Sequence, residues 1–167
     1  MPSDEVFALD ANVFIEAARR YYAFDLVPAF WEKLAEHASG GRIESIDRVK
    51  SELERGHDEL AEWVGGPFAG AFASTAGEDI VDAYREVIRW VEGQSQFLPP
   101  AKAEFAAGAD GWLVAYAIVK ERVVVTHEVV APDVRRRVPI PNVCRAFGLP
   151  PCIDTFQMLR VLGVRLG

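Results

Sequence analysis

The sequence has few residues of the types that build disulfide scaffolds or zinc sites. It contains two cysteines, Cys144 and Cys152, and three histidines among 167 residues. Two cysteines are too few for a disulfide framework, and these two do not form a Cys-x-x-Cys pair. The histidines stand apart from one another, without the spacing of zinc ligands. Both cysteines are therefore expected to be buried structural thiols.

Long hydrophobic runs are absent as well. No apolar stretch approaches the roughly 20 residues needed to cross a bilayer. The first five residues are acidic and lack the basic and then apolar order of a signal peptide. We therefore expect a cytoplasmic protein that is not associated with a membrane.

Positive charge is also scarce. Lysine and arginine number 18 against 25 aspartates and glutamates, which gives a formal net charge of −7. A protein that coats nucleic acid would usually be basic, whereas a nuclease that holds divalent cations is not excluded. The bases cluster at Arg19–Arg20 and at Arg135–Arg137. Either cluster could meet a phosphate backbone, although a solvated patch is the simpler explanation of so short a run.

Hydrophobic patterning predicts short buried strands that alternate with helices in one domain, residues 1–167. Strands are expected at 7–9, 42–46 and 123–126, with an edge strand at 138–140. Residues 65–77 are rich in Gly, Ala and Ser and are expected to form a loop. This alternation predicts an α/β fold with a mostly parallel sheet. Helices are expected at 13–20 (with Asn12 as its cap), 28–39, 48–55, 60–64, 78–92, 99–105, 110–122, 141–147 and 155–162.

Carboxylates stand where the strands of such a sheet would end. Asp10 and Glu128 each follow an apolar strand, Asp110 begins an apolar helix, and Glu52 borders the apolar stripe of another helix. Ligands of α/β sheets bind beyond the carboxyl ends of the strands. Carboxylates repel one another and lose solvation when gathered, whereas Mg²⁺ is held by oxygen ligands. The pattern predicts metal-dependent cleavage of a phosphodiester.

Each acid also has a structural explanation when it is taken alone. Asp10 is compatible with a turn, and Asp110 with a favourable helix dipole worth about 0.3–1 kcal/mol. Glu52 lies four residues after Arg48, and an exposed pair at that spacing is worth about 0.2–0.5 kcal/mol. Gly111 is a poor helix former, which indicates close approach of another group to this helix.

Taken in order, four short motifs resemble the PIN domain superfamily. The match covers about residues 6–162, and several segments look like one uncharacterised PIN-like subgroup of prokaryotic proteins. The motifs are Leu9-Asp10-Ala11-Asn12, Arg48-Val49-x-x-Glu52-Leu53, Ala109-Asp110-x-x-Leu113-Val114-Ala115-x-Ala117 and Val125-Thr126-x-Glu128.

The resemblance implies a three-layer α/β/α fold with a short, mostly parallel central sheet flanked by helices. It implies a ribonuclease that uses one or two Mg²⁺ or Mn²⁺ ions, similar to toxins of the virulence-associated protein C type. Single-stranded or structured RNA, an antitoxin protein and a homodimer are the partners it allows. The implied metal-binding and catalytic residues are Asp10, Glu52, Asp110 and Glu128, with Asn12 and Thr126 as their polar neighbours and Arg19, Arg20, Arg48 and Lys50 as RNA contacts.

One position departs from the toxin pattern and leaves a second function open. Glu128 stands where these toxins commonly carry aspartate, and its extra methylene could shift a contact with metal or water. A catalytically degenerate PIN-like protein-interaction module is therefore the alternative. A phosphatase that forms an aspartyl phosphate is disfavoured, because Asn12 stands where that class expects a second aspartate.

Overall fold

A four-stranded parallel sheet forms the centre of the molecule. The computed structural model describes residues 4–167, so the acidic start of the chain lies partly outside the described residues. The strand order is β3-β2-β1-β4, and every neighbouring pair is parallel. The predicted α/β class and parallel sheet are confirmed. The strands are β1 (Phe7–Leu9), β2 (Ile43–Ile46), β3 (Phe72–Ala73) and β4 (Val123–Val125).

Helices occupy most of the remaining chain. A five-residue π-helical stretch, Ala17–Tyr21, directly continues α1, and a short 3₁₀ turn, Ala69–Ala71, precedes β3. Within residues 4–167 no helix combines the length and the apolar character required to cross a bilayer. The α-helices are α1 (Ala11–Glu16), α2 (Pro28–Ser39), α3 (Asp47–Glu54), α4 (Glu59–Gly65), α5 (Glu78–Glu92), α6 (Pro99–Ala107), α7 (Asp110–Lys120), α8 (Ile140–Ala146) and α9 (Thr155–Leu162).

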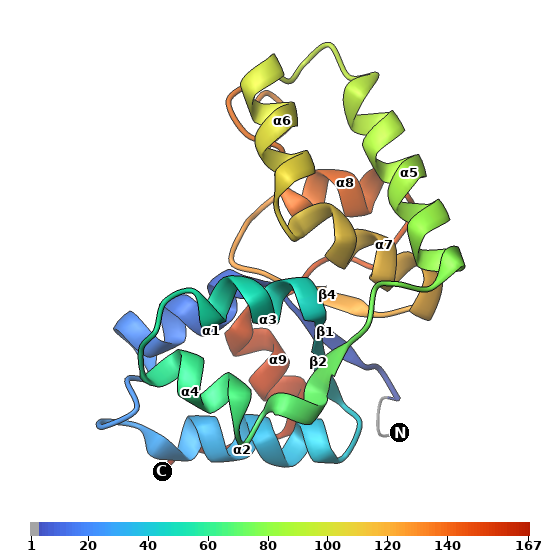
Figure 1. The fold of residues 1–167 in the computed structure, drawn as a ribbon. Coiled ribbons are helices and arrows are strands. Elements are labelled where there is room, and N and C mark those ends of the chain that lie inside the picture. The colour runs from blue at the N-terminus through green and yellow to red at the C-terminus, as the bar shows by residue number, and fades with distance from the viewer. Residues whose placement is uncertain (1–3) are drawn as a thin grey trace.

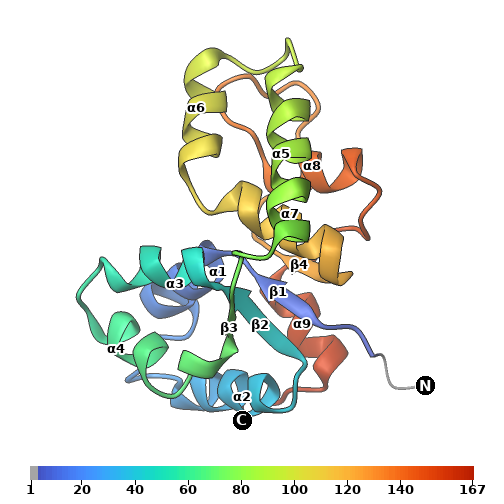
Figure 2. The same ribbon diagram turned by 45° about the vertical axis from the view of Figure 1, so that its right-hand side comes forward.

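These helices cover both faces of the sheet. Figures 1 and 2 show α7 against one face, with α5, α6 and α8 beyond it, while α2 and α9 lie on the opposite side. Helix α7 is apolar nearly all round because it lies between the sheet and α5, whereas α5 buries a single face. The expected three-layer arrangement is confirmed. The buried side chains of α5 are Ile80, Val87 and Val91.

Three local predictions were wrong. Residues 138–140 form no strand, because Pro139 (φ −68°) is preset for the position before a helix and Ile140 begins α8. The fourth strand is β3, which lies in the stretch predicted as a loop and pairs with β2 at only two positions. Asn12 does not cap α1: the helix begins at Ala11, so Asn12 is already helical.

Gly111, in the first turn of α7, is where two aromatic rings approach the helix, as predicted. A Cβ at this position would lie 3.1 Å from Cε1 of Phe105 and 3.1 Å from Cε2 of Tyr84. The Tyr84 ring is stacked on Trp112 at 3.7 Å between centroids, and its hydroxyl donates to a carbonyl of α6. Gly111→Ala should lower the free energy of unfolding by about 1 kcal/mol despite the better helix propensity of alanine. Urea unfolding tests this, with Gly65→Ala, in α4 where the space is open, as the control that should not lose stability.

Candidate metal centre at the carboxyl edge of the sheet

Asp10 lies at the carboxyl end of β1 and is almost completely buried, with 2% exposure. Its backbone N–H donates to the carbonyl of Val125 at 3.0 Å. Its carboxylate accepts a hydrogen bond from the hydroxyl of Thr126 at 3.0 Å. Strand β4 and the residue that follows it therefore fix the backbone and the side chain of Asp10. Burial, and then the charge of Glu128, raise the pKa of Asp10 to about 7.

Asp110 and Glu52 meet at the start of α7. Asp110 is the first residue of that helix, and Oε1 of Glu52, from α3, accepts the backbone N–H of Ala109 at 3.1 Å. Burial raises the pKa of Asp110 to about 8, and the charges of Asp10, Glu128 and Glu52 act in the same direction. The four predicted acids therefore come from different parts of the chain and share one electrostatic environment.

Glu128 follows β4 and already has a basic partner. Its backbone N–H donates to the hydroxyl of Thr126 at 3.2 Å, so this hydroxyl contacts both Asp10 and Glu128. The carboxylate of Glu128 forms an ion pair with Arg137, whose charge lowers the pKa of Asp110. Asp110, Glu128 and Arg137 border a cavity of about 330 Å³. Its lining residues are Asn12, Ala101, Glu104, Phe105, Asp110, Glu128, Arg137 and Val138.

The chemistry of this cluster suits a hard divalent cation. Its donors are carboxylate and hydroxyl oxygens, which Mg²⁺ and Mn²⁺ prefer. Burial, and then the charges of the neighbouring acids, raise the pKa values of Asp10 and Asp110, so both carboxyls resist ionisation near neutral pH when no cation is bound. In the part of the chain that is described, no three His, Cys, Asp or Glu side chains are grouped closely enough to hold a metal ion as they stand. The carboxylates would have to draw together around a bound ion.

Arg48, one of the predicted RNA contacts, packs against protein groups. Its guanidinium carbon lies 3.8 Å from the centroid of the Trp112 ring, and its Nε donates to the hydroxyl of Thr75 at 3.0 Å. That hydroxyl in turn donates to Asp47 at 2.8 Å. These contacts tie α3 to α7 and to the segment after β3, so Arg48 helps to place Glu52 and Asp110.

The other three predicted RNA contacts lie in different surroundings. Arg19 lines a cavity of about 140 Å³ that Glu52 also borders. Arg20 pairs with Glu16 at 3.4 Å on the surface of the first helical segment. Lys50 lies 6.0 Å from the centroid of the Phe72 ring. Their contact with RNA stays a prediction, and Arg19 shares a cavity with the predicted metal ligand Glu52.

Two residues near the acids have roles that the sequence pattern does not show. Arg137 belongs to a basic cluster in the sequence, but nothing in its spacing indicates that it enters the acidic cavity. His127 stands between Thr126 and Glu128, yet its Nε2 lies 3.1 Å from the hydroxyl of Thr155. That contact gives His127 a structural partner on α9.

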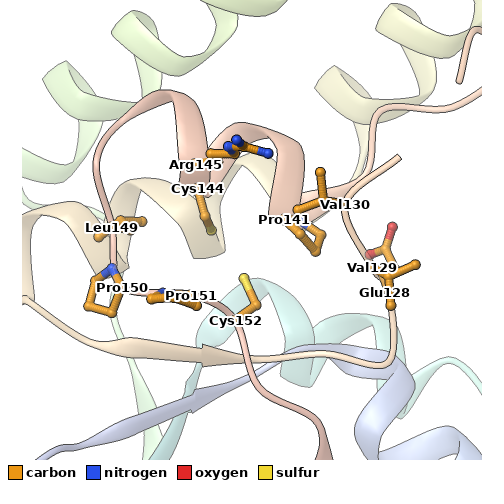
Figure 3. A pocket seen from close by; sticks show the side chains of 10 residues that line it. All are labelled: Glu128, Val129, Val130, Pro141, Cys144, Arg145, Leu149, Pro150, Pro151 and Cys152. Atoms are coloured by element: carbon orange, nitrogen blue, oxygen red, sulfur yellow. The ribbon is translucent and has the colours of Figure 1, made fainter. Parts of the chain in front are cut away.

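A second cavity, of about 430 Å³, adjoins Glu128 and has a different character. Figure 3 shows the sulfur atoms of Cys144, from α8, and Cys152 directed toward one another. The hydrogen bond that the Cys144 thiol donates to Cys152, together with burial, raises the pKa of Cys144. The expected burial is confirmed for Cys144, whereas Cys152 is half-buried. The cavity is lined by Glu128, Val129, Val130, Pro141, Cys144, Arg145, Leu149, Pro150, Pro151 and Cys152.

Comparison with known proteins places this architecture in a class and then in a family. The fold is PIN-like, with helices on both faces of a short parallel sheet. It is similar to a chain of the crystal structure of VapBC2 from Rickettsia felis bound to a DNA fragment from their promoter, with a TM-score of 0.50 and 15% sequence identity. The alignment covers 89% of this chain and 96% of that one. At this identity the likeness establishes the fold alone.

The sequence itself defines the family. Residues 7–166 match the family described as "Domain of unknown function (DUF4411)", and the chain belongs to that family. No curated protein matches the sequence. The family description carries no activity, so the function has to be argued from the carboxyl edge of the sheet.

Proposed function

We propose that this chain is a Mg²⁺- or Mn²⁺-dependent endoribonuclease that cleaves single-stranded RNA. The observation that carries the proposal is the shared electrostatic environment of Asp10, Asp110 and Glu128 at the carboxyl edge of the sheet. Fold stability does not explain this arrangement, because each ionised carboxylate disfavours ionisation of the others. A divalent cation removes that conflict. The resemblance to PIN ribonucleases supports the same assignment.

In this proposal each residue has a stated task. Asp10, Glu52, Asp110 and Glu128 would hold one or two ions, and Thr126 orients Asp10 through its hydroxyl. The chemistry that such a cation would supply is a lowered pKa for a bound water and compensation of the negative charge on the scissile phosphate. Asn12 presents an exposed amide at the cavity. Attack by water would form one P–O bond while the bond to the leaving ribose oxygen breaks. That oxygen would gain a proton, so the products are a phosphate monoester and a hydroxyl end.

We further propose that the chain is the toxin of a toxin-antitoxin pair. The support is its likeness to a chain of VapBC2. Co-expression with the product of the neighbouring gene, followed by pull-down, tests the antitoxin partner. Absence of both a complex and a growth effect would count against it. The homodimer and the cytoplasmic location also stay predictions.

The ribonuclease activity is tested with labelled single-stranded RNA and the purified chain. We expect cleavage in excess Mn²⁺, none after chelation with EDTA, and weaker cleavage of a fully paired duplex. Restoring Mn²⁺ to the chelated sample should restore the activity, which separates a metal requirement from irreversible damage. Absence of cleavage in Mn²⁺, or equal cleavage in EDTA, would contradict the proposal.

One observation favours the second candidate function, a PIN-like protein-interaction module without catalysis. Glu128 is engaged by Arg137, and no three potential ligands within residues 4–167 are grouped for a metal as they stand. Calorimetric titration with Mn²⁺ separates the two functions. Measurable binding supports the nuclease, and absence of any binding heat in excess metal supports the interaction module.

A further inference from the structure

The acidic cavity contains a positive charge supplied by the chain itself. Arg137 lines it together with Asn12, Asp110 and Glu128. Its Nη2 pairs with Oε1 of Glu128. The Glu128 side chain is 11% exposed and that of Arg137 is 59% exposed. The carboxylate is therefore enclosed, while the guanidinium reaches it from the solvent side.

The backbone around Arg137 is held in place. The N–H of Leu98, at the start of α6, donates to the carbonyl of Arg135 at 2.9 Å. On the other side of Arg137, Val138 is buried in the core. The hydrogen bond to Arg135 and the burial of Val138 hold the backbone on both sides of Arg137. The guanidinium is thereby placed at the cavity, although residues 126–139 contain no helix or strand.

We propose that Arg137 competes with a divalent cation for Glu128 and, once displaced, binds a phosphate group of the RNA. This inference rests on the proposed function. Glu128 directs a carboxylate oxygen at the guanidinium, and a metal ion would take that same oxygen as a ligand. A guanidinium binds carboxylate and phosphate through the same planar set of donors, so the released Arg137 has an equivalent partner in the RNA backbone.

Arg137→Gln is the variant that tests this competition. Arg136→Gln is the matched control, because it removes the same charge from an exposed neighbour in the same loop. An ion pair with one exposed partner is worth up to about 1 kcal/mol, so we expect Arg137→Gln to bind Mn²⁺ about fivefold more tightly in calorimetric titration. The control should stay within about twofold, since it lacks the contact with Glu128.

RNA binding should change in the opposite direction. Hydrogen bonds to charged groups contribute about 1.5 kcal/mol or more, so we expect the KM of Arg137→Gln for single-stranded RNA to rise about tenfold. The control should raise the KM much less, by at most about twofold, because it removes a surface charge without removing the guanidinium that pairs with Glu128. Tighter metal binding together with weaker RNA binding is the result expected if Arg137 leaves Glu128 and then binds an RNA phosphate.

The outcomes separate this inference from the proposed function. Equal Mn²⁺ affinity of wild type and Arg137→Gln overturns the competition while leaving the nuclease in place. Absence of Mn²⁺ binding by both overturns the competition and the nuclease together.

If Arg137→Gln does not fold, the wild-type chain provides the test. The Nε–H resonance of Arg137, assigned by its loss in Arg137→Lys, should move during titration with Mg²⁺. The resonance of Arg136 should stay in place. An Arg137 resonance that does not respond to saturating Mg²⁺ overturns the inference.

Discussion

Asp10→Asn is expected to abolish RNA cleavage and to stabilise the fold at the same time. The amide keeps the shape of the carboxylate and an oxygen that can accept the hydroxyl of Thr126, so the local structure should persist. It is a far poorer ligand for a hard cation. Loss of the charge that holds the ion should lower cleavage roughly 100- to 1000-fold. Initial rates at saturating Mn²⁺ measure this loss.

The gain in stability follows from the direction of the pKa shift. The pKa of Asp10 is raised to about 7 in the folded chain, against roughly 3.9 for an unfolded aspartate. The folded state thus binds more protons between these values, and the free energy of unfolding falls as the pH rises from about 4 to about 7. Asparagine does not ionise. The variant should therefore be more stable than wild type at pH 8 by roughly 2 kcal/mol, and nearly equal at pH 4.

Asp25→Asn is the matched control for Asp10→Asn. Asp25 is exposed, so the same chemical change should alter neither cleavage nor stability appreciably. Urea unfolding at pH 4 and pH 8 completes the comparison. Undiminished cleavage by Asp10→Asn would remove Asp10 from the site. A lower free energy of unfolding for Asp10→Asn than for wild type at pH 8 would show that burial of the ionised Asp10 carboxylate does not destabilise the fold.

The second large effect is a pH-dependent stabilisation by metal. At pH 8, a Mn²⁺ concentration about 100 times the Kd should add about 2.7 kcal/mol, which corresponds to a rise in Tm of about 5–10 °C for a chain of this size. At pH 5, Asp10 and Asp110 are mostly protonated because their pKa values are raised to about 7 and about 8. The metal must then displace protons, and the rise should shrink to below about 2 °C.

Scanning calorimetry at both pH values measures this difference. For Asp10→Asn, Mn²⁺ should raise the Tm little at either pH. The variant lacks the carboxylate that would bind the metal at pH 8 and that is protonated in the metal-free protein at pH 5. A wild-type shift of equal size at pH 5 and pH 8 would indicate that the ion binds elsewhere on the acidic surface, where carboxyls ionise well below pH 5.

The same feature of the sequence predicts both the sheet and the positions of the acids. Apolar runs such as Val123–Val125 indicate strands buried on both faces, and the residue after such a strand falls at the carboxyl edge. Strand β3 was not predicted, because two residues in a Gly- and Ala-rich stretch form a strand only by pairing with the edge of β2. The role of Arg137 was not predicted either, because its position depends on a loop that is hydrogen-bonded to the start of α6. Pairings of distant segments leave no periodic signal in the sequence.

The hydroxyl of Thr126 couples the side chain of Asp10 to the backbone of Glu128. It donates to the carboxylate of Asp10 and accepts from the backbone of Glu128. Ionisation of Asp10 makes that carboxylate a stronger acceptor and polarises the hydroxyl toward it. A change of charge deep in the sheet is thereby transmitted to the main chain that begins the 128–139 loop. One oxygen atom therefore links the protonation state of Asp10 to the backbone conformation at the start of the loop that borders the candidate site.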